Sequence, residues 1–212
     1  MKIYRKLRPE FMKAAGELFA EAFEDKLRFF LGPKEVMKKV IPYLIDKEQV
    51  LSIVSDTNEL IGIAGFSYEQ KNMFSINIKA MVRQYGLIQG LYKMFQLGIY
   101  FPNSFPVTHL YIDAITIKAD YRGKGYIRLL FQELEKVAFE KGTTNLQLDV
   151  SCDNAPAIRA YRKMGFYELK SETLDSSTAS RIGISRVNRM IKILDLRNPT
   201  FCHQYGIINR NF

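Results

Sequence analysis

The sequence predicts a domain of the α/β (α+β) class, in which strands and helices alternate along most of the chain. Three observations support this class. A strand-like apolar run that ends at Ile117 is followed by a glycine-rich loop and a helical pattern. A second, alternating strand at 146–150 is followed at once by a helix start, and two helical patterns and a strand hairpin precede both units. We therefore expect one layered domain.

The N-terminal half is predicted to contain a strand, two helices and a hairpin. Residues 3–7 have the apolar content of a short strand, and 9–23 repeat apolar residues at helical spacing. A second helix is expected over 33–45, which Pro42 should kink or end early. The hairpin that follows has strands at 50–55 and 60–68, joined by the turn residues of 56–59.

The connection between the third and fourth strands is long and contains a helical stripe. Apolar residues recur there at alternating spacings of four and three, which places them on one face of a helix: Met81, Tyr85, Ile88, Tyr92, Phe95 and Ile99. Two interpretations are open. A long connection in a compact domain is usually functional, so the helix could form a lid or wall over an acceptor pocket. Packing on the sheet or on a second subunit, as in a homodimer, is favoured, because an apolar seam needs only a flat surface to cover it.

The C-terminal half repeats strand and helix. The expected elements are a strand ending at 117, a helix over 125–141, a strand over 146–150, a helix from 154, and strands over 166–173 and 189–196. The whole chain, 1–212, is predicted to be a single domain, with an insertion at 73–106 and a C-terminal tail at 197–212.

Composition agrees with one core and no stabilising metal or disulfide. The chain has 212 residues, of which 47% are hydrophobic, and this suffices for a single sizeable core. The N-terminus has no apolar signal region, and the most apolar later window carries three cations, so we expect neither secretion nor a membrane span. Cys152 and Cys202 lie far apart without CxxC spacing, which argues against a zinc site. A cytoplasmic location is expected.

The loop Arg122-Gly-Lys-Gly125 predicts a pyrophosphate site. It places free backbone N–H groups and two cations at a helix N-terminus, where the helix dipole is positive. A Walker-type loop needs Ser or Thr after its lysine, but Gly125 follows Lys124. A dinucleotide fingerprint needs a third glycine, but Arg128 stands in its place. Since the loop alone fits a simple strand-to-helix turn equally well, a second motif has to decide.

The second motif starts about thirty residues later. Asn154 suits a helix N-cap, and Gly165 suits the residue just after a helix end. With Arg122-x-x-Gly125, the pattern Asn154-x-x-Ala157-x-x-x-Tyr161-x-x-x-Gly165-Phe166 resembles the acyl-CoA core of the GNAT N-acetyltransferase superfamily. The motifs span about 110–166, and elsewhere the resemblance lies in the order of elements. It implies the GNAT acyl-CoA-binding fold, a mixed central sheet flanked by helices, with 73–106 as a helical insertion between the third and fourth strands.

The resemblance also implies a co-substrate and the residues that bind it. Acetyl-CoA would donate an acetyl group to an amine that attacks directly, with no metal. In the family, the pantetheine arm of coenzyme A lies along the splayed fourth strand, and backbone N–H groups there bind the thioester carbonyl. Carried over to this sequence, the cofactor-binding residues are Ile115, Thr116, Ile117, Arg122, Gly123, Lys124, Gly125, Tyr126, Ile127, Asn154, Ala157 and Tyr161.

Three residues are candidates for catalysis. Tyr161 matches the family tyrosine near the thiol, and a phenol, with a reference pKa of about 10, can protonate a departing thiolate. Alternation along the strand should place 109, 111, 113, 115 and 117 on one face, and the family base often lies at Asp113 or Tyr111. Asp113 is preferred because a carboxylate, directly or through a water, can take the proton of an ammonium. An Asp113 that only orients substrate or bonds the backbone is the alternative.

One position departs from the family pattern. Ile127 stands two residues after Gly125, where the family usually has Gly or Ala because the backbone passes close to the pyrophosphate. The helix pattern indicates that its side chain turns toward the core, where it would be harmless. If it faced the phosphates instead, the affinity for the cofactor would fall.

The charge and the remaining alternatives complete the prediction. The net charge of +9 has a use in binding coenzyme A phosphates, and no nucleic-acid motif accompanies it, so nucleic acid is not expected as a partner. Basic walls would repel polycations, which favours neutral or acidic amines, although the acceptor itself is not encoded in any motif. A domain that binds acyl-CoA without turnover is the second interpretation. A hydrolase using Cys152 with His109 or His203 ranks far below both.

Overall fold

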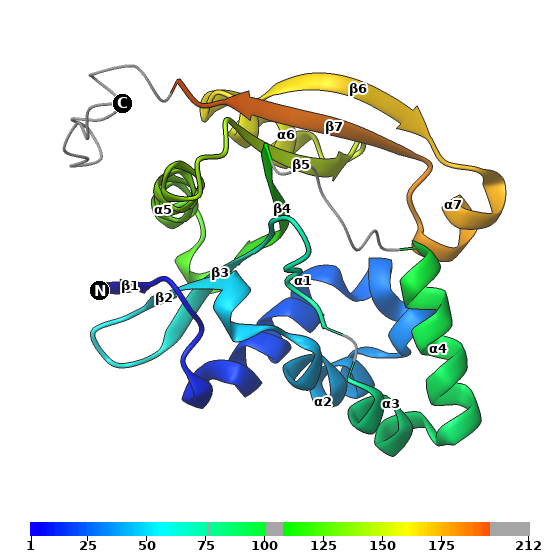
Figure 1. Cartoon of the computed structure of the whole chain (residues 1–212). Helices are drawn as coiled ribbons and strands as arrows, with labels where there is room; N and C mark the ends of the chain where they lie inside the picture. The colour runs from blue at the N-terminus through cyan, green and yellow to red at the C-terminus, as the bar shows by residue number, and fades with distance from the viewer. Residues whose placement is uncertain (76, 101–107, 196–212) are drawn as a thin grey trace.

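The computed structural model describes residues 1–75, 77–100 and 108–195, and its centre is a seven-stranded mixed sheet (Figure 1). Within these ranges the strand order is β1-β2-β3-β4-β5-β7-β6, and β4 and β5 form the parallel pair. The strands are β1 (Lys2–Tyr4), β2 (Val50–Val54), β3 (Leu60–Ser67), β4 (His109–Ile117), β5 (Asn145–Ser151), β6 (Tyr167–Thr173) and β7 (Arg186–Ile193). The helices are α1 (Met12–Leu31), α2 (Lys34–Leu44), α3 (Ile78–Tyr85), α4 (Leu87–Tyr100), α5 (Tyr126–Glu140), α6 (Ala155–Lys163) and α7 (Ser176–Ile182).

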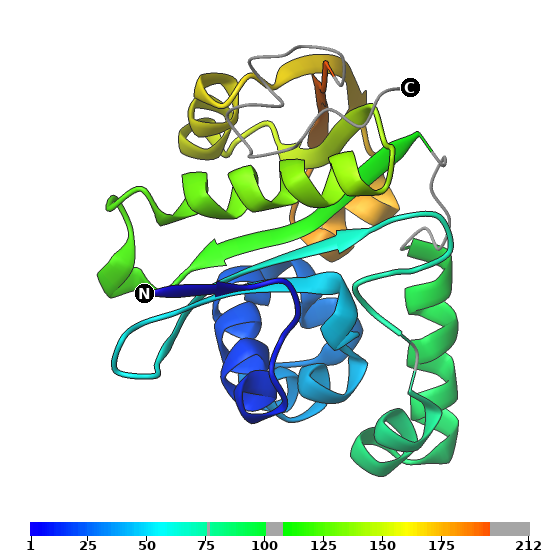
Figure 2. The same cartoon turned by 60° about the vertical axis from the view of Figure 1, so that its left-hand side comes forward.

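Helices cover both faces of the sheet and create two hydrophobic cores. Figure 2 shows α1 and α2 on one side of β3 and β4, with α5 on the other. Phe30, Met37 and Ile41 are fully buried in the core beneath α1 and α2. Leu130, Phe131 and Leu134 of α5 are buried in the second core, which the strand residues of β4, β5 and β7 complete. The predicted mixed central sheet flanked by helices is thus confirmed.

A β-bulge interrupts β4 at Asp113. Gly65 of β3 lies opposite Ala114 and Phe66 lies opposite Ile112, so Asp113 has no counterpart on the neighbouring strand. Ile112 belongs to the α5 core and Ala114 to the α1 and α2 core, while Ile115 and Ile117 pack on the α5 side again. The prediction that residues 109, 111, 113, 115 and 117 share one face is therefore wrong, because an extra residue reverses the alternation beyond it.

Pro42 does not end α2 early, which was one of the two outcomes expected from sequence. The helix continues to Leu44. A Cβ atom added to Gly16 of α1 would lie 2.5 Å from the Cγ atom of Pro42, so the glycine lets the proline ring pack directly on the neighbouring helix. This close contact offsets the hydrogen bond that proline cannot donate. In addition, α1 runs on past the predicted end at 23, through a non-helical backbone conformation at Phe23, to Leu31.

The connection between β3 and β4 contains two helices, so the prediction of one continuous helix is wrong. Gly86, with φ of 80°, ends α3, and its N–H donates to the carbonyl of Val82. Met81 on α3 is fully buried. The part of the stripe on α4 is exposed: the side chains of Ile88, Tyr92, Phe95 and Ile99 all face solvent. The break at Gly86 explains the difference, because it rotates the second half of the stripe away from the core.

Helix α7 was absent from the sequence prediction. Its N-cap Asp175 accepts hydrogen bonds from the N–H groups of Ser177 and Thr178, and Gly183 follows its end in the left-handed conformation. Both are ordinary helix signals, although seven residues are too few to show a periodic pattern. Within the described ranges, no helix combines the length and the apolar character that crossing a membrane requires.

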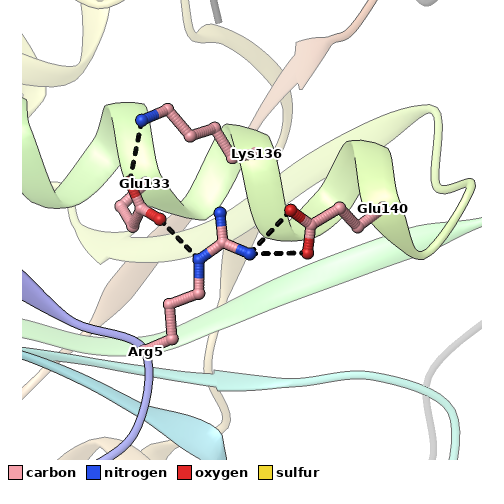
Figure 3. A network of polar contacts seen from close by, with 4 residues as sticks. All are labelled: Arg5, Glu133, Lys136 and Glu140. Atoms are coloured by element: carbon pink, nitrogen blue, oxygen red, sulfur yellow. Dashed lines mark hydrogen bonds and ion pairs between the residues drawn. The ribbon is translucent and has the colours of Figure 1, made fainter. Parts of the chain in front are cut away.

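Ion pairs attach α5 to the segment after β1 and to β7. Figure 3 shows the guanidinium of Arg5 between two carboxylates of α5, at 2.7 Å from Glu133 and 2.6 Å from Glu140. Lys136 contacts the same Glu133 at 3.1 Å. These groups are partly exposed, so each contributes little alone. Together they join the segment after β1 to a helix about 130 residues later in the sequence.

The buried ion pair between α5 and β7 should contribute more to the stability of the fold. The Nζ atom of Lys192 on β7 lies 2.6 Å from a carboxylate oxygen of Glu135 on α5, whose side chain is 4% exposed. We expect Lys192→Met to lower the free energy of unfolding by about 3 kcal/mol, because it takes the ammonium partner from a buried carboxylate. Urea denaturation measures this change.

The matched control is Lys38→Met, which breaks the exposed pair between Lys38 and Glu35. That change should have little effect on the free energy of unfolding, because solvent screens an exposed pair. Equal losses for the two variants would contradict the distinction between the buried and the exposed pair.

Candidate active site

The sheet opens between β4 and β5. These strands are paired from His109 opposite Asn145 to Ile112 opposite Leu148, and the ladder stops there. Among the described strands, β4 continues beyond that point only with β3, and β5 continues only with β7. Alternate backbone groups of 113–117 therefore point into the gap without a strand partner. Because β4 and β5 are parallel, the helices that follow them, α5 and α6, both begin at this open end.

The predicted phosphate loop lies at the N-terminus of α5. Gly123 and Gly125 have φ values of 74° and 82°, a left-handed conformation that glycine adopts readily. Gly125 is the N-cap and provides no side-chain cap, so the N–H groups of Tyr126 and Ile127 stay available, while that of Arg128 donates to the Gly125 carbonyl. Residues 122–125 are all exposed, and two of them, Arg122 and Lys124, are cations. This arrangement suits a pyrophosphate.

The loop is held from both sides. The Nε atom of Arg122 donates to the carbonyl of Ile117 at 3.0 Å, which ties the loop to the end of β4. Glu59, in the β2–β3 turn, pairs with Lys118 and accepts a hydrogen bond from the Tyr121 hydroxyl at 2.9 Å. These bonds fix the backbone before the glycines. Ile127 is half-buried and packs on the α5 core. Its side chain is therefore not expected to interfere with binding of the pyrophosphate.

The short helix α6 places Tyr161 beside the core. The side chain of Asn154 accepts a hydrogen bond from the N–H of Ala157 at 3.2 Å, as the N-cap prediction requires. The ring of Tyr161 packs edge-on against Phe131, with centroids 5.8 Å apart. Burial raises the pKa of Tyr161 to about 12, and the hydroxyl makes no hydrogen bond within the described ranges. The Tyr161 hydroxyl is therefore protonated at neutral pH and can donate a hydrogen bond to a bound molecule.

Asp113 lies on the bulge of β4, at the level where the gap opens. The hydroxyl of Ser67 donates to its carboxylate at 2.7 Å. The Asp113 side chain is exposed, and desolvation by the neighbouring protein raises its pKa to about 7, against the opposite effect of the Ser67 hydrogen bond. A pKa near neutrality suits a general base.

Tyr111 lies beside a pair of charged residues that the sequence analysis missed. Arg189 of β7 donates to both carboxylate oxygens of Asp149 on β5, each at 2.9 Å. Burial first, and then the negative charges of Asp149 and Asp113, raise the pKa of Tyr111 well above its ordinary value. A phenol with a raised pKa stays protonated at neutral pH and donates a hydrogen bond. Of the two candidates for the general base, Asp113 therefore suits the role. A polar residue in the middle of the strand at 146–150 was the signal for Asp149.

Cys152 has neighbours that do not activate a thiol. Its Sγ atom lies 2.9 Å from Oδ1 of Asn188 and 3.8 Å from the Ser171 hydroxyl. The Nδ1 atom of His109 instead bonds the hydroxyl of Thr108 at 2.8 Å. His203 and Cys202 lie outside the described residues. No histidine of the described ranges contacts Cys152, and the arrangement gives a cysteine hydrolase no base.

Gly125→Ala should weaken binding of acetyl-CoA about tenfold, because a side chain at φ 82° strains the backbone that presents the N–H groups. Gly142→Ala is the matched control. Gly142 also has a positive φ, 68°, and open space around a new Cβ, but it lies beyond the other end of α5. Both variants should lose about 1 kcal/mol of stability. Calorimetric titration with acetyl-CoA should separate them, and equal affinities would contradict the role of this loop.

Comparison with known proteins agrees with this geometry. The model of the Acetyltransferase (GNAT) family matches residues 12–166. The chain therefore belongs to the GNAT family of acetyltransferases, which confirms the resemblance found in the sequence. A streptothricin acetyltransferase from Streptomyces lavendulae is 46% identical to it over 57 residues. That match covers 27% of this chain, which spans only 30% of the relative's length.

Solved structures confirm the GNAT fold. An N-acetyltransferase from Staphylococcus aureus Mu50 superposes with a TM-score of 0.63 at 19% identity, over 90% of this chain and all of the other. A structure described as an acetyltransferase superposes with a TM-score of 0.62, also at 19% identity, over 92% of this chain and all of the other. At these identities the similarity concerns the fold.

Proposed function

We propose that this protein is an acetyl-CoA-dependent N-acetyltransferase, which moves an acetyl group to the primary amine of a small molecule or peptide by direct attack. One observation carries the proposal. Two titratable groups near the open end of β4 and β5 have pKa values that suit opposite roles, about 7 for Asp113 and about 12 for Tyr161. At neutral pH the first can accept a proton and the second can donate one. Membership in an acetyltransferase family supports this assignment.

Acetyl-CoA would bind along the open end of the sheet. The N–H groups and cations of 122–125 suit its pyrophosphate, with Tyr126 and Ile127 in the first turn of α5. The pantetheine arm would lie along 115–117, and Asn154 and Ala157 would flank it from α6. Backbone N–H groups of the unpaired part of β4 can polarise the thioester carbonyl without any requirement on side chains.

The chemistry then needs three proton transfers. The ammonium loses one proton to Asp113, directly or through a water, and the lone pair of the neutral amine forms the new C–N bond at the thioester carbon. The C–S bond of the tetrahedral intermediate breaks, the thiolate takes the proton of the Tyr161 hydroxyl, and the second proton lost by the nitrogen restores the Tyr161 phenol. The products are the amide and coenzyme A. No covalent acyl-enzyme is required, so Cys152 has no part in this scheme.

For the acceptor we propose only a chemical class. Asp149 is neutralised by Arg189, and the basic composition favours neutral or acidic amines. Streptothricin belongs in the acceptor screen because a partial relative bears that name. We also place the activity in the cytoplasm, which agrees with the free thiol of Cys152.

Calorimetric titration with acetyl-CoA and, separately, with dephospho-CoA tests the proposal first. We expect micromolar binding of acetyl-CoA that weakens when the 3′-phosphate is missing, because the cations of the loop region then lose a partner. Thiol release in the presence of a panel of amines follows. Binding without turnover for every amine would favour the second interpretation, a non-catalytic acyl-CoA sensor. Failure to bind either compound would overturn both.

A further inference from the structure

The outer face of α4 is a continuous apolar surface. Six large side chains are between 47% and 83% exposed: Leu87, Ile88, Leu91, Tyr92, Phe95 and Ile99. With successive residues about 100° apart around a helix, all six fall within an arc of about 140°. Gly98 lies in the same arc, no residue of the arc is charged, and the hydroxyl of Tyr92 accepts a hydrogen bond from Gln96 at 3.2 Å. We call these seven residues the α4 face.

The opposite side of α4 is anchored to the protein. The Nζ atom of Lys93 donates to the carbonyl of Phe30 at 2.8 Å and lies 5.0 Å from the ring centroid of Tyr85. The Tyr85 hydroxyl, just before α4, donates to the carbonyl of Leu31 at 2.5 Å. Both views place α4 at the edge of the molecule (Figures 1 and 2). The α4 face is thus turned outward, while the opposite side of the helix contacts the rest of the protein.

We propose that the α4 face binds a second copy of this chain, forming a homodimer in which the two α4 helices pack on each other. The area supports this occupant. Since a side chain of this size presents on the order of 200 Å² when fully exposed, the six expose about 800 Å² at their observed fractions. A stable interface of standard size buries about 800 Å² on each partner. The α4 face supplies that area.

Charge also favours a second copy over a membrane. A chain with net charge +9 repels its own copies, so self-association needs a surface free of like charges. The α4 face has none. A helix that lies on a membrane carries Lys and Arg beside its apolar face to meet anionic headgroups. Lys93, the single cation of α4, is instead used inside the protein.

Gly98 suits the close contact of two helices. A Cβ atom added there would meet nothing within 4 Å in the single chain, so neither space nor backbone conformation requires glycine. In a pair of α4 helices, a residue without a side chain lets the backbones approach and gives the partner's larger side chains a place to pack. A twofold axis across α4 would make the same face serve both copies.

Sedimentation velocity at about 1 to 100 µM protein tests the proposal without reference to activity. We expect the wild-type chain to sediment as a dimer, and Ile88→Asp to raise the dimer dissociation constant at least about 30-fold, because Ile88 is the most exposed residue of the α4 face, at 83%. Ile78→Asp is the matched control, because Ile78 is also exposed, at 56%, and also lies in the first turn of its helix. An acid in a first turn does not harm either helix.

Phe95→Asp gives a second test on the same face, and thermal unfolding confirms that each variant is folded. Three results would overturn the proposal. The wild-type chain could remain a monomer over the whole range. The dimer could persist in both Ile88→Asp and Phe95→Asp, or be lost equally in Ile78→Asp. The chain could instead sediment with phosphatidylserine vesicles in a manner abolished by Ile88→Asp, which would make a membrane the partner.

Discussion

Tyr161→Phe should lower kcat at least about 100-fold and leave the dissociation constant of acetyl-CoA unchanged, since general acid catalysis of this kind contributes about 10² to 10⁴. Phenylalanine keeps the ring that packs on Phe131 and Phe166, so the fold and the shape of the site are preserved. The variant removes one proton donor and nothing else. Steady-state thiol release gives kcat, and calorimetry gives the affinity.

The control for Tyr161→Phe is Tyr167→Phe, which removes a phenol hydroxyl from an exposed position on β6. That variant should keep full activity. If Tyr161→Phe also kept full kcat, Tyr161 would be a packing residue, and another donor or water would have to protonate the thiolate. A loss of acetyl-CoA affinity with no change in kcat would likewise contradict the role of a general acid.

Asp113→Asn should lower kcat/KM about 100-fold or more at pH 8 and abolish the acid limb of the pH profile. In the wild-type enzyme, kcat/KM should rise with pH until about 7, because burial raises the pKa of Asp113 to that value and the carboxyl is a base only when ionised. Above pH 7 the rate should level off. The asparagine variant has no group that titrates there, so its residual rate should stay flat.

Ser67→Ala provides the graded test of the same assignment. The Ser67 hydroxyl donates to Asp113 and lowers the pKa of that carboxyl, so its removal should move the acid limb to higher pH with little change in the plateau. Ser67 also accepts a hydrogen bond from the N–H of Met73 at 3.1 Å, so the variant should lose about 1 kcal/mol of stability. An unshifted acid limb would show that Asp113 does not set the profile.

The same raised pKa has a consequence for stability. The carboxylate of Asp113 is less well solvated in the folded chain than in the unfolded chain, where its pKa is about 4. Stability is therefore lost as pH rises from about 4 through 7. Asp113→Asn removes this effect, so at pH 8 it should unfold at a higher temperature than the wild type while being less active. A lower melting temperature would argue for a structural Asp113.

The features that depend on local sequence signals were predicted correctly. The loop at 122–125 and the helix from Asn154 were placed correctly, because glycines at positive φ and an asparagine cap are read from single residues. The bulge at Asp113 was missed, since it depends on the register with β3, which no local pattern reveals. The pair of Asp149 and Arg189 joins two strands about 40 residues apart and escaped for the same reason. Gly86 was a sign of a helix break in the sequence, but the regular spacing of the apolar stripe favoured one continuous helix.

The bulge in β4 separates what the strand does for the fold from what it does for the reaction. If residue 113 were absent, Ile112 would be followed by Ala114, and the two residues would still point to opposite cores, as they do now. Asp113 is therefore an addition to a regular strand and replaces no packed side chain. Evolution could exchange or delete this carboxylate without repacking either side of the sheet, so the architecture does not depend on the residue that we propose as the base.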